Sequence, residues 1–330
     1  MSGHFARLAA LAEILFVLAL GNIAGVMIYE ALLPAAVVAG EASPTVTALY
    51  GGLRIFLRIG LVGAFGLGLL WFRRGLTPRD AGLTRAGKPL GHLIGIGILL
   101  GGFTSLLTAI VFAVYTLFPF GEGLAAWKDM RNSEINTAFF VELLATSIFI
   151  PPLVEEIMSR GYNRVRMVES YGPMGGVILT GLIFALAHTK FISSDPLLMV
   201  FMVITIIASI SWTYVAQKTG SVIPSMVGHA MGNSIAVAIL FNVWLPLAAV
   251  GALVAWQHRP IVAMLSQFKA DWRADRQKSG LLYGFIMMLG ILGATMLAMS
   301  QFGRMAGMLG VGGLALLITI INIWKEKRSA

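Results

Sequence analysis

Two adjacent carboxylates and one guanidinium stand in the stretch PPLVEEIMSR at 151–160, directly after a long apolar segment. Glu156 and Arg160 are four residues apart, so they share one face of a helix and can form an ion pair. Glu155 lies about 100° around the helix from Glu156, which leaves it the carboxylate less easily neutralised within its own helix. A carboxylate of this kind can act as a general base toward water.

The same residues have a simpler interpretation, in which the apolar segment ends near 154 and a solvated helix end follows. Pro151 and Pro152 argue against a simple helix end, because proline weakens helix hydrogen bonding just before the two acids. In a membrane such breaks are tolerated mainly where neighbouring groups or a cavity satisfy the freed backbone.

His188, in the stretch FALAH, follows Phe184 by four residues. A lone histidine near the end of a span is often an interface residue. The position of His188 relative to the turn at 171–173 instead indicates that it lies near Glu155. Glu155 is 16 residues before Tyr171, and His188 is 15 residues after Pro173. If both arms are helical, each side chain lies roughly 22–24 Å from the turn, at 1.5 Å per residue. An antiparallel hairpin then brings Glu155 and His188 to the same depth.

His229 and Asn233 stand in the stretch GHAMGN inside a later apolar segment. They are four residues apart and point the same way. Gly228 and Gly232 mark an adjacent stripe on which another helix can approach closely. Both polar side chains can donate hydrogen bonds without carrying a fixed charge. The alternative is an ordinary hydrogen bond between helices.

Together these groups suit hydrolysis of a peptide bond, which needs a base for water and donors for the developing oxyanion. Glu155 can be the base, and His188 can hold the water with it. His229 and Asn233 can form an oxyanion hole. The Glu156–Arg160 pair then holds the helix in register.

The composition requires these groups to lie in a membrane protein. Of 330 residues 58% are hydrophobic and 12% charged, with a mean hydropathy of +0.85, whereas soluble domains are about 45–50% apolar. The fold class expected is an all-α, polytopic membrane bundle of about 8–10 transmembrane helices. There is no cysteine, which excludes disulfides and thiolate metal sites. The net charge of +9 is assigned to basic loops, so no nucleic-acid partner is expected.

Ten apolar segments can be marked along the chain. They are 8–30, 46–72, 91–119, 137–159, 173–189, 195–217, 221–241, 243–256, 281–300 and 305–323. The first is too long for the apolar region of a signal peptide, about 7–15 residues, so a retained helix is favoured over cleavage. The basic connections 73–90 and 257–280 face the cytoplasm if both termini do. This predicts a multi-pass inner-membrane protein with cytoplasmic termini.

Three segments of the chain are distinguished by their polar content. Residues 1–136 are N-terminal transmembrane helices, 137–242 form the catalytic core, and 243–330 are a C-terminal transmembrane extension. Outside the core, Glu13, Arg54 and Arg58 are expected to snorkel, to pair with one another or to line a cavity. Lys190 and Asp195 are expected to be loop residues. Pairs of small residues four apart, such as Gly91/Gly95 and Gly97/Gly101, predict close helix packing.

The ordered motifs E-E-x-x-x-R, F-x-x-x-H and H-x-x-x-N resemble the CPBP family of type II CAAX prenyl proteases and bacteriocin-processing enzymes, also called the ABI family. The resemblance covers about 140–240. It implies a glutamate-dependent intramembrane endopeptidase without a cofactor, acting on a membrane-associated peptide or protein in the bilayer. It further implies that Glu155 and His188 activate water and that His229 with Asn233 stabilises the oxyanion.

Three alternatives stay open on the sequence. A zinc-dependent intramembrane metalloprotease would use Glu155, His188 and His229, which form a His₂Glu ligand set, although the chain lacks an H-E-x-x-H motif. A proton-coupled transporter would also contain intramembrane Glu and His, but spread over different depths and in repeated halves. A non-catalytic scaffold or immunity protein would not need all four of the proposed catalytic side chains.

Overall fold

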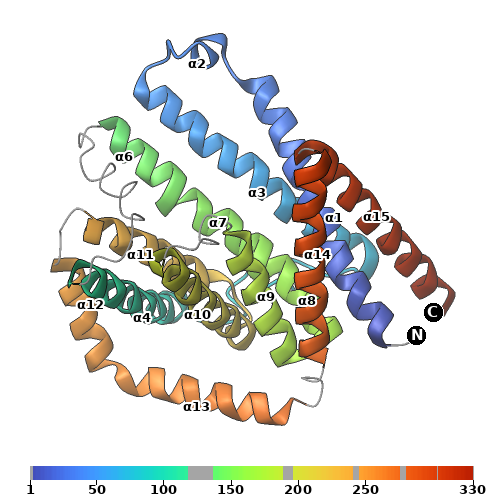
Figure 1. Ribbon diagram of the computed structural model, residues 1–330. Coiled ribbons are helices and arrows are strands. Elements are labelled where there is room, and N and C mark those ends of the chain that lie inside the picture. The colour runs from blue at the N-terminus through green and yellow to red at the C-terminus, as the bar shows by residue number, and fades with distance from the viewer. Residues whose placement is uncertain are drawn as a thin grey trace.

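The computed structural model describes residues 3–117, 137–188, 196–240, 245–275, 280–302 and 304–329. Within these ranges the chain is helical and contains no strand, which confirms the all-α prediction (Figure 1). The connection 118–136 and the expected loop residues Lys190 and Asp195 lie outside the described residues.

The helices follow the apolar segments closely. The N-terminal ones are α1 (Gly3–Leu32), α2 (Ala35–Val38), α3 (Pro44–Arg74) and α4 (Leu90–Leu117). A nearly continuous helical stretch follows, made of α6 (Thr137–Leu143), the π-helix η1 (Leu144–Ile148), α7 (Ile150–Glu156), the π-helix η2 (Ile157–Asn163) and α8 (Arg164–Tyr171). The remaining helices are α9 (Pro173–Ala187), α10 (Pro196–Thr219), α11 (Ile223–Leu240), α12 (Leu245–Trp256), α13 (His258–Ala274), α14 (Gly280–Phe302) and α15 (Arg304–Ser329).

Four helical stretches in the described part of the chain are long and apolar enough to cross a membrane: Gly3–Leu32, Pro44–Arg73, Leu90–Val111 and Leu198–Thr219. Shorter apolar stretches are Pro173–Ala187, Leu245–Trp256, Gly280–Thr295 and Leu309–Lys325. The chain is therefore a polytopic helical membrane protein. The predicted number of about 8–10 spans stays a prediction, because only four of the described helical stretches are long and apolar enough to cross a membrane.

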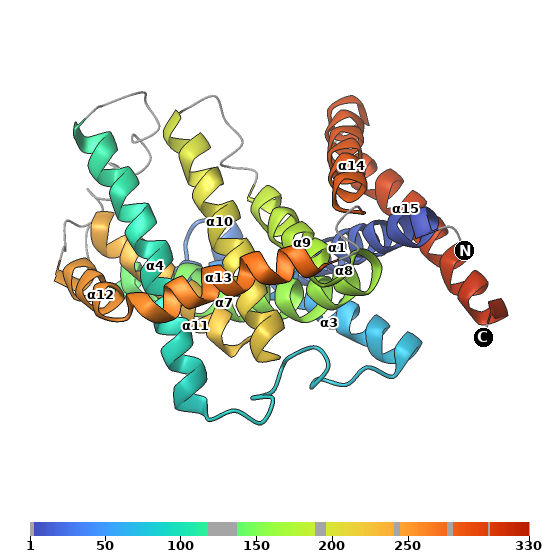
Figure 2. The same ribbon diagram turned by 90° about the horizontal axis from the view of Figure 1, so that it is seen from below.

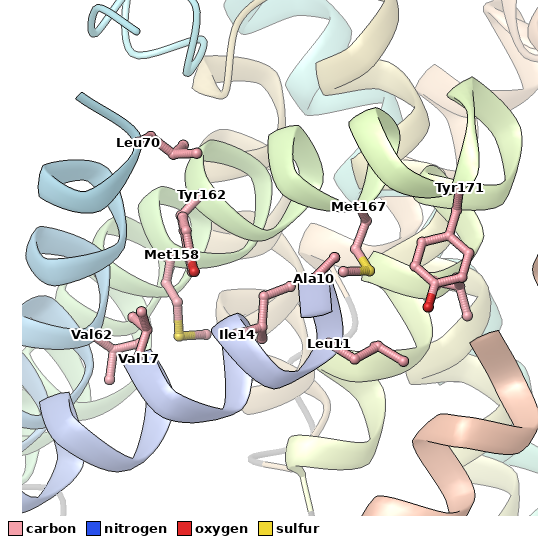
Figure 3. Packing of buried hydrophobic residues seen from close by; sticks show 11 residues of the cluster. Ala10, Leu11, Ile14, Val17, Val62, Leu70, Met158, Tyr162, Met167 and Tyr171 are labelled. Carbon is pink, nitrogen blue, oxygen red and sulfur yellow. The ribbon is translucent and has the colours of Figure 1, made fainter. Parts of the chain in front are cut away.

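Helix α1 packs against α3 and against the η2–α8 stretch (Figure 3). Ile14 and Val17 of α1 contact the cluster that also contains Val62 and Met158. The close approach requires glycine, because a Cβ added at Gly21 would lie 2.5 Å from Val62 Cγ2. This layer positions the helix that carries the two candidate glutamates.

The buried carboxylate of Glu13 has partners other than those expected from the sequence. It forms ion pairs with Arg73 and Arg166, the latter at 3.0 Å between Arg166 Nε and Glu13 Oε2. Arg58 instead donates to an asparagine side chain of α1, and Arg54 lies over a tyrosine ring. Of the three alternatives for these residues, the pairing of Glu13 with Arg54 or Arg58 is therefore wrong, because tertiary packing places the end of α3 and helix α8 closer to this carboxylate.

Glycines also set the crossing of α4 and α11. A Cβ on Gly101 would lie 2.8 Å from the carbonyl oxygen of Gly228, and one on Gly97 would lie 2.7 Å from the carbonyl oxygen of Pro224. The predicted close approach at the Gly228 stripe is thus confirmed. Gly91 and Gly95 differ, since no neighbouring atom of the described residues lies within 4 Å of a Cβ added at either, so their predicted packing role is wrong.

Helix α13 occupies a connection for which the sequence indicated only basic character. It runs across α4 and α10 in Figure 2. Its Phe268 and Trp272 pack against Met174 of α9 and Tyr214 of α10. The chain termini lie near one another, at the ends of α1 and α15 (Figures 1 and 2).

Candidate active site

Pro151 shapes the helix that carries the glutamates. Proline has no N–H, so the carbonyl of Ser147, four residues earlier, loses its normal helix partner. The side chain of Asn233 on α11 supplies the missing donor, with Asn233 Nδ2 2.7 Å from Ser147 O. Ser147 belongs to the π-helix η1. The expected satisfaction of the broken backbone by a neighbouring group is confirmed, and it ties α11 to this helix.

Glu156 is the centre of a fully buried polar network. Its Oε1 accepts from Arg160 Nη1 at 2.9 Å and lies 2.9 Å from His229 Nδ1. Glu156 and Arg160 are both 0% exposed, so the ion pair predicted from their spacing is present and entirely desolvated. The pair joins two turns of one helix, and the imidazole joins that helix to α11.

The guanidinium of Arg160 is fixed on its other sides as well. Its Nη2 donates to Ser209 Oγ at 2.7 Å and to Ser209 O at 3.2 Å. Its Cζ lies 4.2 Å from the centroid of the Phe184 ring and 5.4 Å from that of Trp212. A cation between aromatic faces is stabilised by the quadrupoles of the rings. Arg160 therefore connects the glutamate helix to α9 and α10.

Glu155, the preceding residue on the same helix, approaches both imidazoles. Its Oε2 is 4.0 Å from His188 Nε2 and 4.0 Å from His229 Nε2. This oxygen is buried, and among the described residues it has no hydrogen-bond partner. The side chain is 15% exposed, against 0% for Glu156. The adjacent carboxylates thus differ: Glu156 is bound through Oε1 to Arg160 and His229, whereas Glu155 faces two imidazoles at 4.0 Å.

Aromatic contacts hold the two histidine rings in place. The ring of His229 stacks on Trp212, with centroids 4.8 Å apart and planes at 26°. His188 Nδ1 lies 2.9 Å from the carbonyl oxygen of Phe184, and its ring centroid is 4.8 Å from the Phe184 centroid. In each histidine the Nδ1 atom is engaged, which leaves Nε2 directed toward Glu155.

The position of His188 also depends on the other end of α9. The helix begins at Pro173, and its Gly172 N-cap offers no side chain to the free backbone N–H groups. Asp275, which follows α13, supplies the missing acceptor: its Oδ2 lies 2.8 Å from Met174 N and 3.4 Å from Gly175 N. A carboxylate there also complements the helix dipole. The segment after 243 thus anchors the helix that ends at His188.

Residues 136–235 match the family described as type II CAAX prenyl endopeptidase Rce1-like. The match covers this segment, which is less than a third of the chain. No curated protein and no solved structure matches the chain. The family indicates a membrane-embedded protease of the CAAX endopeptidase type that acts on peptide substrates, in agreement with the resemblance seen in the three motifs. The division of the chain into segments 1–136, 137–242 and 243–330 stays a prediction.

All six residues singled out in the sequence lie within or next to the polar network around Glu156. They are Glu155, Glu156, Arg160, His188, His229 and Asn233. Sequence reasoning missed Ser209, Trp212 and Asp275, which hold Arg160, His229 and α9. Serine and tryptophan in an apolar helix have no motif that reveals such a role. Asp275 offered a weak signal, as an acid directly after an amphipathic helix.

The geometry of the site bears on the possibility of metal binding. The described residues contain no group of three His, Asp or Glu side chains positioned to hold one metal ion. The two imidazole Nε2 atoms nevertheless face one carboxylate oxygen, and each Nδ1 is fixed by an oxygen, as in many zinc sites. The zinc alternative with Glu155, His188 and His229 therefore stays open to direct test.

Proposed function

We propose that the chain is an intramembrane endopeptidase in which Glu155 activates the attacking water. The observation that supports this most is the buried Glu155 oxygen, unpartnered within the described residues and 4.0 Å from two imidazole nitrogens. That separation exceeds a direct hydrogen bond, about 2.7–3.2 Å, and suits a water bridging the carboxylate and an imidazole.

In the proposed reaction the Glu155 carboxylate takes a proton from water, and the hydroxide adds to the carbonyl carbon of the scissile peptide bond. His188 orients the water through Nε2. The tetrahedral intermediate then expels the amine, which takes up the proton held by Glu155. The products are a new carboxyl terminus and a new amino terminus, so no oxidant, reductant or cofactor is consumed.

The oxyanion of that intermediate is proposed to be stabilised by His229 and Asn233. An asparagine amide carries two N–H donors, and the contact with Ser147 O uses one of them. His229 can donate through Nε2 while Nδ1 also donates to Glu156 if the ring is an imidazolium, which has an N–H on both nitrogens. Glu156 and Arg160 are assigned a positioning role, because their charged atoms bind one another, His229 and Ser209.

The substrate is proposed to be a membrane-associated peptide or protein, in the inner membrane, with both termini of the enzyme in the cytoplasm. The basic connections 73–90 and 257–280 support this orientation through the positive-inside rule. Accessibility of tags at either terminus in sealed spheroplasts tests it. Labelling of both tags from the outside would reverse the proposed orientation.

The test of the mechanism is Glu155→Gln, which keeps the shape of the side chain and removes its basicity. Cleavage of a farnesylated CAAX reporter and of native membrane peptides is measured in reconstituted vesicles. Activity is expected to fall by about 10²–10⁴-fold, the typical contribution of a general base. Glu142→Gln, an exposed glutamate earlier in the same helical stretch, is the matched control.

Three results would contradict the proposal. Undiminished cleavage in Glu155→Gln would exclude this residue as the base. Activity abolished by exhaustive chelation and restored by zinc would replace the metal-free mechanism with the metalloprotease. A chain that cleaves no membrane peptide while binding one would instead indicate the non-catalytic scaffold.

A further inference from the structure

A cavity separate from the catalytic groups lies between α4, α10 and α13. Its volume is about 450 Å³, within the range of about 300–1,000 Å³ of sites that hold one small ligand. Leu99 and Phe103 of α4, Val215 of α10, and Ile261 and Met264 of α13 contribute to its apolar walls. The aromatic wall of the catalytic site is close, because Val215 packs in one cluster with Phe184 and Trp212.

Helix α13 covers this cavity and is fastened beside it by side chains. Asp271 Oδ2 lies 2.7 Å from Tyr214 Oη and 2.7 Å from Lys218 Nζ, both on α10. The ring of Phe268 meets that of Tyr214 edge to face, with centroids 5.0 Å apart. These contacts fasten the C-terminal part of α13, whereas the cavity is bordered by Pro260, Ile261, Ala263, Met264 and Gln267.

The polar residues of the cavity wall indicate which head group fits. Lys218, Thr219 and Gln267 are among its lining residues, and the Lys218 side chain is 46% exposed. An ammonium has three donors, so Lys218 can bind Asp271 and a second anion together. Lys269 and Arg273 are exposed on α13. Apolar walls beside the Lys218 ammonium suit a hydrocarbon chain that carries a negatively charged head.

The outer face of α13 indicates where such a molecule comes from. Val262 and Leu265 are 56% and 53% exposed, and Lys269 and Arg273 are exposed on the same helix. A helix that combines exposed apolar and basic residues is typical of a membrane interface with anionic lipids. The bilayer therefore supplies amphiphiles directly beside the cavity.

We propose that this cavity binds one acyl chain of an anionic phospholipid, with the phosphate beside Lys218 and α13 as the cover. The occupant is a lipid of the surrounding bilayer rather than a part of the peptide that is cleaved. The proposal does not depend on the proposed function, since lipid retention is measured without any proteolysis.

The test is native mass spectrometry of the full chain, reconstituted with dioleoyl phosphatidylglycerol and then exchanged into detergent. The wild type is expected to retain one phosphatidylglycerol per chain. Ala263→Phe fills the cavity from α13 and is expected to lower the retained fraction at least about tenfold, because aromatic bulk replaces the space of the chain. Ala270→Phe, on the same helix and outside the cavity lining, is the matched control and is expected to retain the lipid.

Three outcomes overturn the proposal. Equal retention by the wild type, Ala263→Phe and Ala270→Phe means that the lipid does not occupy this cavity. Equal retention of dioleoyl phosphatidylcholine and phosphatidylglycerol means that the cavity does not select an anionic head group. Displacement of phosphatidylglycerol, one for one, by a farnesylated peptide assigns the cavity to the substrate instead. If Ala263→Phe does not fold, Ala263→Leu is compared with Ala270→Leu.

Discussion

Glu156 and His229, which are 73 positions apart in the chain, are joined by a 2.9 Å contact between Oε1 and Nδ1. The same oxygen accepts from Arg160 at 2.9 Å. One carboxylate therefore fixes both the helix that carries Glu155 and the imidazole that faces Glu155. Loss of this contact is expected to act on the site through position rather than through the chemical step.

Glu156→Gln is expected to destabilise the fold by about 3–5 kcal/mol, because it leaves the guanidinium of Arg160 buried without its counter-charge. Thermal unfolding in detergent measures the effect. The double variant Glu156→Gln with Arg160→Met removes both charges and is expected to recover part of the loss. A double variant as unstable as the sum of both single variants would show that the two charges do not act as a pair.

Asn233→Ala is expected to lower kcat by about 10²–10³-fold, the typical effect of removing one oxyanion donor, with a smaller change in KM. It also frees the carbonyl of Ser147, so unfolding is measured in parallel. Ser234→Ala removes only a hydroxyl that binds Ala230 O in its own helix, and it is the control. If Asn233→Ala loses stability while kcat per folded enzyme is unchanged, the residue has a structural role alone.

Asp275→Ala is expected to lower the free energy of unfolding by about 0.5–2 kcal/mol, the usual effect of losing a helix N-cap acceptor. Asp275→Asn keeps an oxygen for the N–H groups of Met174 and Gly175 and is expected to retain most of the free energy of unfolding that Asp275→Ala loses. Hydrogen exchange of those two amides reports the cap directly. Unchanged exchange in Asp275→Ala would show that the carboxylate does not cap α9 in solution.

Gly101→Ala is expected to disturb the crossing of α4 and α11, because the added Cβ would lie 2.8 Å from the carbonyl oxygen of Gly228. Overpacking of this kind costs about 1–3 kcal/mol. Gly95→Ala, six residues earlier on α4, is the control, because its added Cβ meets no atom of the described residues within 4 Å. Equal unfolding temperatures for the two variants would contradict the tight crossing.

The attachment of α13 to α10 is expected to depend on pH and to weaken in acid. Partial burial raises the pKa of Asp271, but hydrogen bonds from Lys218, Tyr214 and Gln267 outweigh it and hold this pKa below its ordinary value. The stability of the attachment is then complete above the ordinary value, about 3.9, and is lost as pH falls through the lowered pKa. Hydrogen exchange across 258–274 between pH 7 and pH 2 measures the release.

Asp271→Asn provides the comparison for that experiment. It removes the titrating group, so α13 is expected to exchange faster at neutral pH and to show little further change with acid. Release of α13 in the wild type near pH 6 would contradict the assignment, since the lowered pKa of Asp271 cannot produce a transition there.

Local spacing was sufficient to predict part of the site. The ion pair of Glu156 and Arg160 follows from four residues of separation on one helix, and the approach of His188 to Glu155 follows from equal arm lengths about the turn at 171–173. The all-α membrane fold follows from apolar segments that must satisfy their own backbone hydrogen bonds in lipid. These features depend on helix geometry, which the chain determines over short distances.

The partners across helices were decided by tertiary packing. Nothing in the sequence pairs Asn233 with Ser147 O, Arg160 with Ser209, or Asp275 with the start of α9, because each contact joins segments that are 49 to 101 positions apart. Glu13 shows the same limit, since it pairs with Arg73 and Arg166 rather than with Arg54 or Arg58, which are nearer along the chain. Spacing along the chain fixes which face of a helix a residue occupies, whereas the helix that meets this face depends on how all the helices pack together.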